Sequence, residues 1–375
     1  MQHIRCSCIA RIDLRDPHHS RHWSRRQLGL LLAGSGLAVA TLISSRSWGA
    51  TQGIPVLYTW EGFDSPALVG DFATKHGAPP VFQTFADENE AFENIKAGLH
   101  VDLAHPCADT FGHWNEAGLL QPIDAARLTN WPDLFDRLKA VPGSQSAGKQ
   151  LFIPVDWGTT SVAYRSDLVE SPEQSYRLLW DSRYAGRLSI GEDATETVMM
   201  TALVAGVADP FDMSDSDLAR VKALLANQKP LLKFYWSDDT VIKEAITSGD
   251  IVATSMWSDT FRSLRQQGVP VSFMRPKEGI LSWCCGLVLT KSATEVDAAY
   301  DLIDAILAPS TGVKWIERGS NHANRKTYQL IDEQKLAELG IPRDPSDLLA
   351  SSVFLREYPR LAEYQRMFDE TRDSD

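Results

Sequence analysis

Short apolar runs alternate with helix-like segments after residue 50. Residues 54–60 (IPVLYTW) are β-branched and aromatic, as in a buried strand. Apolar residues then recur at helical spacing between Ser65, a favourable N-cap, and Gly77. A strand, a helix and a strand complete this unit, at 81–85, about 88–97 and 101–104. The order strand–helix–strand–helix–strand predicts an open α/β sheet with parallel strands.

The same alternation returns in the second half of the chain. Strands are expected at 188–190, 234–236 and 251–256, with helices between them. Two apolar segments, 149–165 and 275–289, are expected to carry the chain between two lobes, with Gly158 as a flexible joint. We therefore divide the chain into an export signal (1–50), a first lobe (51–158 and 283–328) and a second lobe (159–282 and 329–375).

Aromatic and acidic residues follow the expected strands in both lobes. In open parallel sheets ligands lie outside the carboxyl ends of the strands. Indole faces attract cations, and carboxylates accept charge-assisted hydrogen bonds from ammonium groups. The pattern therefore predicts a cleft suited to an aliphatic amine with more than one charged end. Its candidate lining is Trp60, Phe63 and Asp109 from one lobe, Asp193, Glu196 and Trp257 from the other, and Trp283 and Cys285 at the second crossing.

These residues could instead serve the fold alone. Trp60 and Trp257 could belong to a core, and Asp109 could be a loop acid in solvent. Asp193 and Glu196 could cap a helix, because acidic residues favour the first turn. The pattern alone leaves both interpretations open.

The N-terminus has the order of an export signal. Arg25 and Arg26 precede an uncharged apolar run at 28–43, and small residues follow near 47–50. The paired arginines indicate the twin-arginine route. A run of about 16 residues is short for a membrane span of about 20. We expect a protein that is soluble in the periplasm after cleavage.

The net charge and the absence of catalytic motifs limit the classes of function that the sequence allows. The chain has a formal net charge of −12, and residues 1–50 contain seven Arg and two Asp, so the remainder carries −17. This balance argues against nucleic-acid binding and suits a cationic ligand. The sequence contains no HExxH, GxSxG or phosphate loop. We expect neither an enzyme nor a cofactor.

Three cysteines follow the signal: Cys107, Cys284 and Cys285. This odd number excludes a dense disulfide framework. Cys107 could be a buried thiol, and the adjacent pair could form a strained bridge. The three could also hold a soft metal ion with nearby acids, although no CxxC or HxxxH spacing supports this. His322 is expected at the surface, in a loop at 319–322.

Seven stretches in order carry a resemblance to a known family. They are LYTWEGF (57–63), VDLAHPC (101–107), AGLLQPID (117–124), IPVDWGTT (153–160), EDATE (192–196), MWSD (256–259) and RPKEGILSW (275–283). With them the chain resembles the periplasmic spermidine/putrescine-binding proteins that deliver polyamines to ABC importers. The resemblance implies a two-lobed type II periplasmic-binding-protein (venus-flytrap) fold with an interlobe hinge. It also implies a putrescine- or spermidine-like ligand and an ABC permease in the inner membrane as partner.

The resemblance also implies site residues. Trp60, Trp257 and Trp283 match the family's aromatic box, and Asp193 and Glu196 match its acidic pair. Four further positions are carried over although the residue type differs. Phe63, Asp109 and Ser320 stand where the family can have Tyr, and Cys107 replaces a small hydroxyl residue.

Two departures bear on the ligand. Cys285 stands where the family has a carboxylate that grips an amine, and Gly62 stands where spermidine binders can carry Glu. A neutral thiol at Cys285 would remove a charged hydrogen bond, ordinarily worth roughly 1.5–3 kcal/mol. Asp109 is a new acid that can compensate from another direction. The alternatives are a different amine, an amino compound with an anionic end, or a periplasmic amine sensor or co-receptor of the same fold.

Overall fold

The computed structural model describes residues 53–374, so the export signal expected at 1–50 lies outside the described residues. Within this range no helix combines the length and the apolar character that a membrane span requires.

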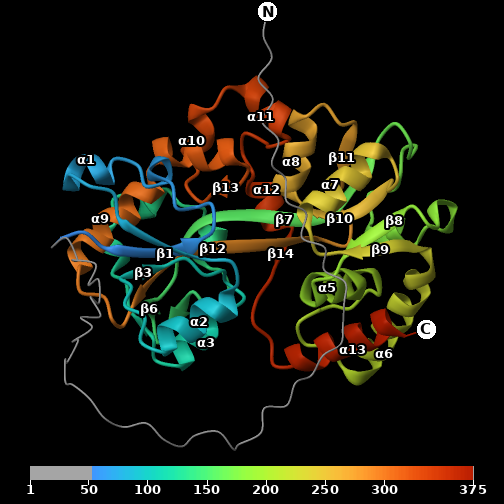
Figure 1. Ribbon diagram of the computed structural model, residues 1–375, viewed down its shortest axis with the longest axis horizontal. Coiled ribbons are helices and arrows are strands. Elements are labelled where there is room, and N and C mark those ends of the chain that lie inside the picture. Colours follow the sequence, from blue (N-terminus) through green and yellow to red (C-terminus); the bar gives the residue numbers. More distant parts are fainter. Residues whose placement is uncertain (1–52, 375) are drawn as a thin grey trace, which may run out of the picture. The chain divides into compact units, whose positions relative to one another are not determined.

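Residues 53–374 form a mixed sheet of twelve strands with the central order β2-β1-β3-β12-β7-β10-β8-β9. Figure 1 shows the two long strands, β7 in green and β12 in brown, running between the elements on the left and those on the right. The strands of the sheet are β1 (Val56–Trp60), β2 (Val81–Phe85), β3 (Leu103–Ala104), β4 (Leu120–Gln121), β7 (Ile153–Arg165), β8 (Leu188–Gly191), β9 (Leu232–Trp236), β10 (Ala253–Trp257), β11 (Val271–Phe273), β12 (Ile280–Thr290), β13 (Asn321–His322) and β14 (Ser352–Phe354). A separate hairpin contains β5 (Gln145–Ser146) and β6 (Lys149–Gln150).

Parallel pairs lie at the two ends of the central order, and one more joins β12 to the off-path strand β14. β1 pairs in parallel with β2 and β3, and β8 pairs in parallel with β9 and β10. The long strands β7 and β12 are antiparallel to each other, and they pair antiparallel with β10 and β3 respectively. The expected α/β class is confirmed, and the sheet is mixed: its outer strands pair in parallel as expected, whereas β7 and β12 are antiparallel to each other.

Helices and 3-10 helices connect and cover these strands. The α-helices are α1 (Phe72–His76), α2 (Glu88–Lys96), α3 (Phe111–Glu116), α4 (Asp136–Lys139), α5 (Ala194–Val204), α6 (Asp215–Gln228), α7 (Asp239–Ser248), α8 (Ser258–Gln266), α9 (Val296–Leu307), α10 (Pro309–Arg318), α11 (Glu333–Leu339), α12 (Ser346–Ala350) and α13 (Leu361–Asp373). The 3-10 helices are η1 (Pro66–Leu68), η2 (Ala125–Arg127), η3 (Trp131–Asp133), η4 (Tyr176–Trp180), η5 (Ser182–Tyr184), η6 (Lys229–Leu231) and η7 (Thr327–Leu330).

The buried apolar side chains form one large cluster for the first half of the sheet and two clusters for the second. Along β7 the cluster changes between Trp157 and Val162, and along β12 it changes between Leu281 and Cys284. Side chains from Ile331 to Phe354, which the sequence assigned to the second lobe, pack in the first cluster. From Leu355 onward they pack in the second half. The lobe boundaries themselves stay a prediction.

The helix expected between Ser65 and Gly77 is divided in two. Ser65 caps the short η1, and α1 begins only at Phe72. Gly70 interrupts the helix with φ of +60°, and a Cβ there would lie 2.5 Å from the hydroxyl oxygen of Thr311. Close packing against the chain near α10 therefore overrides the helical pattern.

His322, expected at the surface, is buried in β13. Its Nδ1 lies 2.9 Å from the hydroxyl of Thr327, and its Nε2 lies 3.2 Å from the carbonyl oxygen of Ile306. Burial lowers the pKa of the ring to about 4, so it is neutral at pH 7. The imidazole is a structural link between β13, α9 and η7.

Gly158, expected to be a flexible joint, lies within the continuous strand β7. It faces Trp283 of β12 in the antiparallel register. A Cβ at this position would overlap Cζ2 and Cε2 of the Trp283 indole. The glycine therefore provides space for an aromatic ring rather than flexibility.

We expect Gly158→Ala to displace the Trp283 ring and to lower the free energy of unfolding by about 1–3 kcal/mol, as for overpacked sites. Urea denaturation followed by tryptophan fluorescence measures this change. Gly191→Ala is the matched control, because a Cβ at this strand glycine would meet only ordinary contacts, at 3.5 Å or more. Equal stability of the two variants would contradict the assigned role of Gly158.

Candidate ligand-binding cavity

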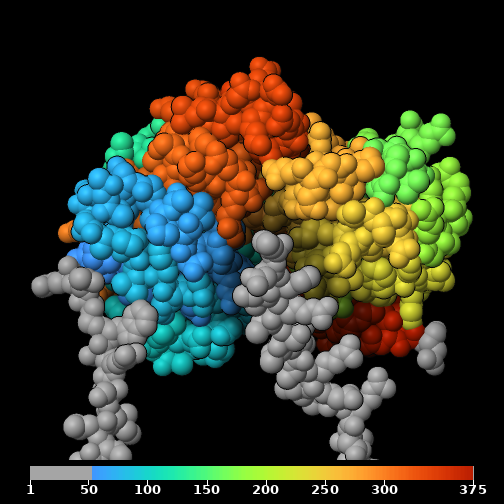
Figure 2. All heavy atoms as spheres, turned by 45° about the horizontal axis from the view of Figure 1, so that its top comes forward, coloured from blue at the N-terminus to red at the C-terminus, as the bar shows by residue number. Residues whose placement is uncertain are grey.

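A cavity of about 450 Å³ lies at the carboxyl ends of β1 and β10, beside the crossing strands β7 and β12. Figure 2 shows the surface hollowed between the residues coloured blue and cyan and those coloured yellow. All ten residues expected at the site line this cavity: Trp60, Phe63, Cys107, Asp109, Asp193, Glu196, Trp257, Trp283, Cys285 and Ser320. The structure brings the set together, and its role in binding a ligand stays a prediction.

Six further residues line the cavity that the sequence did not single out: Glu61, Glu88, Asp156, Thr195, Asp259 and Leu355. Glu61, Asp156 and Asp259 lie inside the stretches that carry the family resemblance, so their position was readable from the sequence. Glu88 is the first residue of α2, directly after β2, which is the same kind of strand-end signal as that of Asp193. Leu355 carries no such signal.

Three half-buried indoles form the aromatic wall. The ring of Trp60 packs on Phe85 with centroids 4.7 Å apart, and the ring of Trp257 meets Trp236 edge to face at 5.4 Å. Trp283 lies over Gly158. Each ring is fixed by packing behind it, so each keeps part of its surface for the cavity.

Asp193 and Glu196 serve the helix and the cavity together. Asp193 caps α5, because its carboxylate accepts the backbone N–H of Glu196 at 2.7 Å. The Glu196 carboxylate accepts the Thr160 hydroxyl at 2.6 Å and the Trp257 indole N–H at 3.1 Å. The helix-cap interpretation and the site interpretation are therefore compatible.

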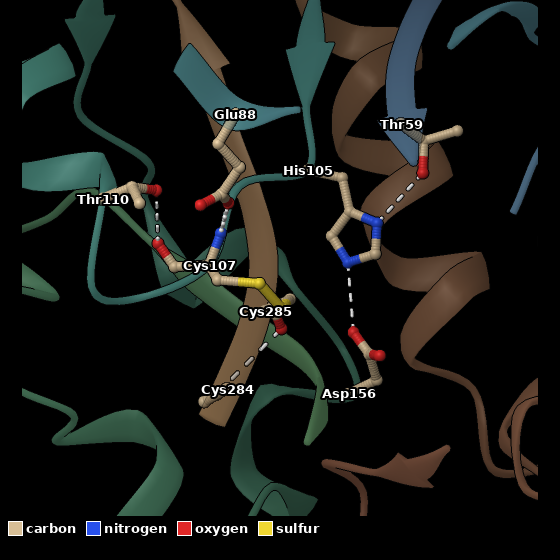
Figure 3. The surroundings of a disulfide bond; sticks show 8 residues. All are labelled: Thr59, Glu88, His105, Cys107, Thr110, Asp156, Cys284 and Cys285. Atoms are coloured by element: carbon tan, nitrogen blue, oxygen red, sulfur yellow. Dashed lines mark hydrogen bonds and ion pairs between the residues drawn. A yellow bond between two sulfur atoms is a disulfide. The ribbon is translucent and has the colours of Figure 1, made fainter. Parts of the chain in front are cut away.

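Glu88 and Asp109 place two more carboxylates on the first half of the sheet. The Glu88 carboxylate accepts the backbone N–H of Cys107 at 2.5 Å (Figure 3). Asp109 follows two residues later and lines the cavity, instead of pointing into bulk solvent as the alternative interpretation had it.

The four carboxyl groups have raised pKa values. Burial, reinforced by the charge of Asp109, raises the pKa of Glu88 to about 8. Burial and then the charge of Asp193 raise the pKa of Glu196 to about 8. Burial raises the pKa of Asp109 to about 6, with Asp193 adding to the rise, and burial also raises the pKa of Asp193. The four groups act on one another, so they form one acidic cluster fed from both halves of the sheet.

Asp156 belongs to a separate buried chain. His105 lies between Thr59 and Asp156, with its Nδ1 3.0 Å from the Thr59 hydroxyl and its Nε2 3.1 Å from the carboxylate (Figure 3). All three side chains are buried. The Asp156 carboxylate is therefore paired with an imidazole, whereas the donors to Glu88, Asp193 and Glu196 are backbone N–H, hydroxyl and indole groups.

Two polar atoms in the cavity lining are buried without a hydrogen-bond partner among the described residues: Oδ1 of Asp259 and Nε1 of Trp60. A buried polar atom that makes no hydrogen bond costs about 1–3 kcal/mol. An acceptor oxygen at Asp259 and a donor at Trp60 are thus left unsatisfied beside the cavity.

Cys107 and Cys285 form a disulfide, and Cys284 is the free cysteine of the described region. The expectation of a neutral thiol at Cys285 is therefore wrong, as is a bridge between the two adjacent cysteines. Successive side chains on β12 point to opposite faces, so Cys285 faces the cavity while Cys284 packs in the core. Within residues 53–374 no group of three or more His, Cys, Asp or Glu side chains is placed to hold a metal ion.

Arg318 lies at the edge of the site. Its guanidinium stacks 4.5 Å from the centroid of the Phe63 ring, and it occupies the space beside Gly62. No lysine or arginine is among the sixteen described residues that line the cavity, whereas seven of them are acidic. No basic residue of the lining therefore balances its acidic side chains.

Comparison with known proteins assigns the chain to a family. Residues 67–338 match the family of bacterial extracellular solute-binding proteins. The chain belongs to this family. The solute-binding protein is thus a binding protein rather than an enzyme, and its fold is the two-lobed type II fold of periplasmic binding proteins.

Individual relatives are similar to this chain over most of its length. The putrescine-binding periplasmic protein of Escherichia coli K12 is 26% identical over 357 residues, covering 89% of this chain and 93% of the relative. A spermidine/putrescine ABC transporter substrate-binding protein of Streptococcus pneumoniae matches in structure with a TM-score of 0.75 at 18% identity, covering 85% of this chain and 99% of that chain. A GABA receptor matches with a TM-score of 0.69 at 18% identity, covering 86% and 98%.

The raised pKa values predict how stability depends on pH. Glu88 and Glu196 hold protons in the folded state that the unfolded chain, with an ordinary glutamate pKa of 4.5, releases. The stabilisation that these two groups contribute is therefore fully present below about pH 4.5. It is lost as pH rises through about 8. We expect the ligand-free protein to become less stable between pH 5 and pH 8, as measured by urea denaturation.

A Glu88→Gln/Glu196→Gln double variant isolates these two groups from all others that titrate in this range. Its stability should depend less on pH than that of the wild type. A wild-type stability that rises from pH 5 to pH 8, with no difference in the double variant, would show that these carboxyl groups are ordinary.

Proposed function

We propose that the protein captures a cationic, putrescine- or spermidine-like amine in the periplasm and delivers it to an ABC permease of the inner membrane. The observation that carries this proposal is the cluster of Glu88, Asp109, Asp193 and Glu196 beside three indole rings. Ammonium groups pair with carboxylates, and the methylene chain between them packs on indole faces.

The charge of the lining supports an amine without an anionic end. A ligand carboxylate would enter a cavity whose lining has seven acidic residues and no basic one among the residues described. Like charges at close range in a partly buried site repel strongly, because water screens them poorly there. The charge pattern therefore favours a ligand that is cationic at each end over an amino acid.

The relatives support the same class of ligand and the same partner. The relative from E. coli is named as putrescine-binding, and the neighbour from S. pneumoniae is named as part of a spermidine/putrescine ABC transporter. A neighbour of the same fold is named as a GABA receptor, so the fold by itself does not select an amine. The acidic lining of this chain is what distinguishes the two kinds of ligand.

Isothermal titration calorimetry with putrescine, spermidine and 4-aminobutanoate tests the proposal. We expect saturable binding of putrescine or spermidine. We expect no binding of 4-aminobutanoate, which has the carbon chain of putrescine but one carboxylate. Tighter binding of 4-aminobutanoate, or no binding of either polyamine, would overturn the proposal.

Trp257 joins the aromatic wall to the acidic cluster through its hydrogen bond to Glu196. We expect Trp257→Ala to weaken amine binding by at least about 10-fold, since it removes a cation–π contact and a charge-assisted hydrogen bond. Trp257→Phe should weaken it less, because a ring remains. Trp131→Ala, which alters a tryptophan outside the cavity, is the control, and calorimetry measures all three. Unchanged affinity in Trp257→Ala would assign Trp257 to the core alone.

A further inference from the structure

The segment 106–108 is attached to β12 like a short additional strand. The Gly286 N–H donates to the Pro106 carbonyl at 3.0 Å, and the Ala108 N–H donates to the Cys284 carbonyl at 2.8 Å. Cys107 and Cys285 face each other in this antiparallel pair, and their sulfur atoms are bonded (Figure 3). The disulfide joins residues 178 positions apart, so it fixes a loop of the first half of the sheet to a crossing strand.

Cys107 also contacts Glu88 directly and lies two residues before Asp109. Its backbone N–H donates to the Glu88 carboxylate at 2.5 Å, and its carbonyl accepts the Thr110 hydroxyl at 3.2 Å. In the sequence, Asp109 lies between Cys107 and Thr110. The positions of Glu88 and Asp109 relative to Trp283 and β12 therefore depend on the attachment of Cys107.

The disulfide also changes which element supplies negative charge. At Cys285 the crossing strand presents a neutral sulfur to the cavity, and the acids stand instead on α2 and on the loop after β3. Asp109 interacts electrostatically both with Glu88 and with Asp193. The cluster thus has an acid pair on each side, Glu88 with Asp109 and Asp193 with Glu196.

We propose, resting on the function proposed above, that Glu88 and Asp109 form a second acidic subsite that binds the second cationic group of the ligand. Cys107 and Cys285 are the positioning residues of this subsite, through their disulfide. The site therefore selects dicationic amines over monocationic ones. A monocation interacts with only one acid pair, so it gains fewer charge-assisted hydrogen bonds from the cluster than a dication does.

The surroundings favour a persistent disulfide over one that exchanges. Cys284, the nearest free cysteine of the described region, packs on the other face of β12, and burial raises the pKa of its thiol. A thiolate is the attacking species in disulfide exchange, so a buried, protonated thiol reacts slowly. The disulfide therefore serves as a fixed support of the subsite.

The test compares putrescine with butylamine, which has the same carbon chain and one ammonium group. Calorimetry, or competition against putrescine where butylamine binds weakly, gives the ratio of the two affinities. We expect Glu88→Gln and Asp109→Asn each to lower putrescine affinity by about 10- to 100-fold and to leave butylamine affinity within about 2-fold. The carboxamide oxygen introduced by Glu88→Gln can still accept the Cys107 N–H, so this variant removes charge and keeps the contact.

Glu90→Gln is the matched control, because Glu90 lies in the first turn of the same helix, is exposed and does not line the cavity. It should leave both affinities unchanged. Equal losses for putrescine and butylamine in Glu88→Gln and Asp109→Asn, or no loss for either ligand, would overturn the subsite. If the wild type binds neither amine, the proposed function fails as well, and the two failures are thus distinguished.

A Cys107→Ser/Cys285→Ser double variant tests the positioning role. We expect the preference for putrescine over butylamine to fall towards that of Glu88→Gln, with the folded state verified by circular dichroism. A folded double variant that keeps the full wild-type preference would show that the disulfide is not needed. Wild-type protein reduced with dithiothreitol and then reoxidised provides a second measurement, in which the preference should fall and recover.

Discussion

The antiparallel pairing of β7 and β12 determines where the other parts of the site lie. These two strands pass from one hydrophobic cluster to the other, so backbone hydrogen bonds rather than a linker join the two halves of the sheet. The pairing places Gly158 opposite Trp283, whose ring requires a facing position without a side chain. Two residues further along β12, Cys285 bonds covalently to Cys107 of the neighbouring segment. The register therefore places both the Trp283 ring and the disulfide beside the cavity.

Much of the site could be predicted from the sequence because strand ends carry local signals. Trp60, Asp193 and Trp257 each stand at or directly after an apolar run, and the structure brings them to one cavity. The family resemblance supported Trp283 and Cys285. Strand-end position would also have selected Glu88, which begins the helix that follows β2.

The parts that failed depend on contacts between distant residues. Cys107 and Cys285 are 178 positions apart, and no local pattern pairs them, whereas adjacency suggested Cys284 with Cys285. The burial of His322 depends on a hydroxyl of η7 and on a carbonyl of α9. The break at Gly70 depends on close packing against α10. In each case a contact with a residue distant in the sequence determined the structure, and the local sequence pattern contains no sign of that contact.

Charge, rather than fold, carries the information about the ligand. Similar folds are named for polyamines and for GABA, so the scaffold accommodates both kinds of molecule. A cation stabilises a cluster of buried carboxyl groups as they ionise, because it offsets both their desolvation and their mutual repulsion, which an anion cannot do. Since these acids come from both halves of the sheet, a cation among them is attracted to both at once. In the proposed function, the interaction that binds the ligand therefore also favours closure of the two halves around it.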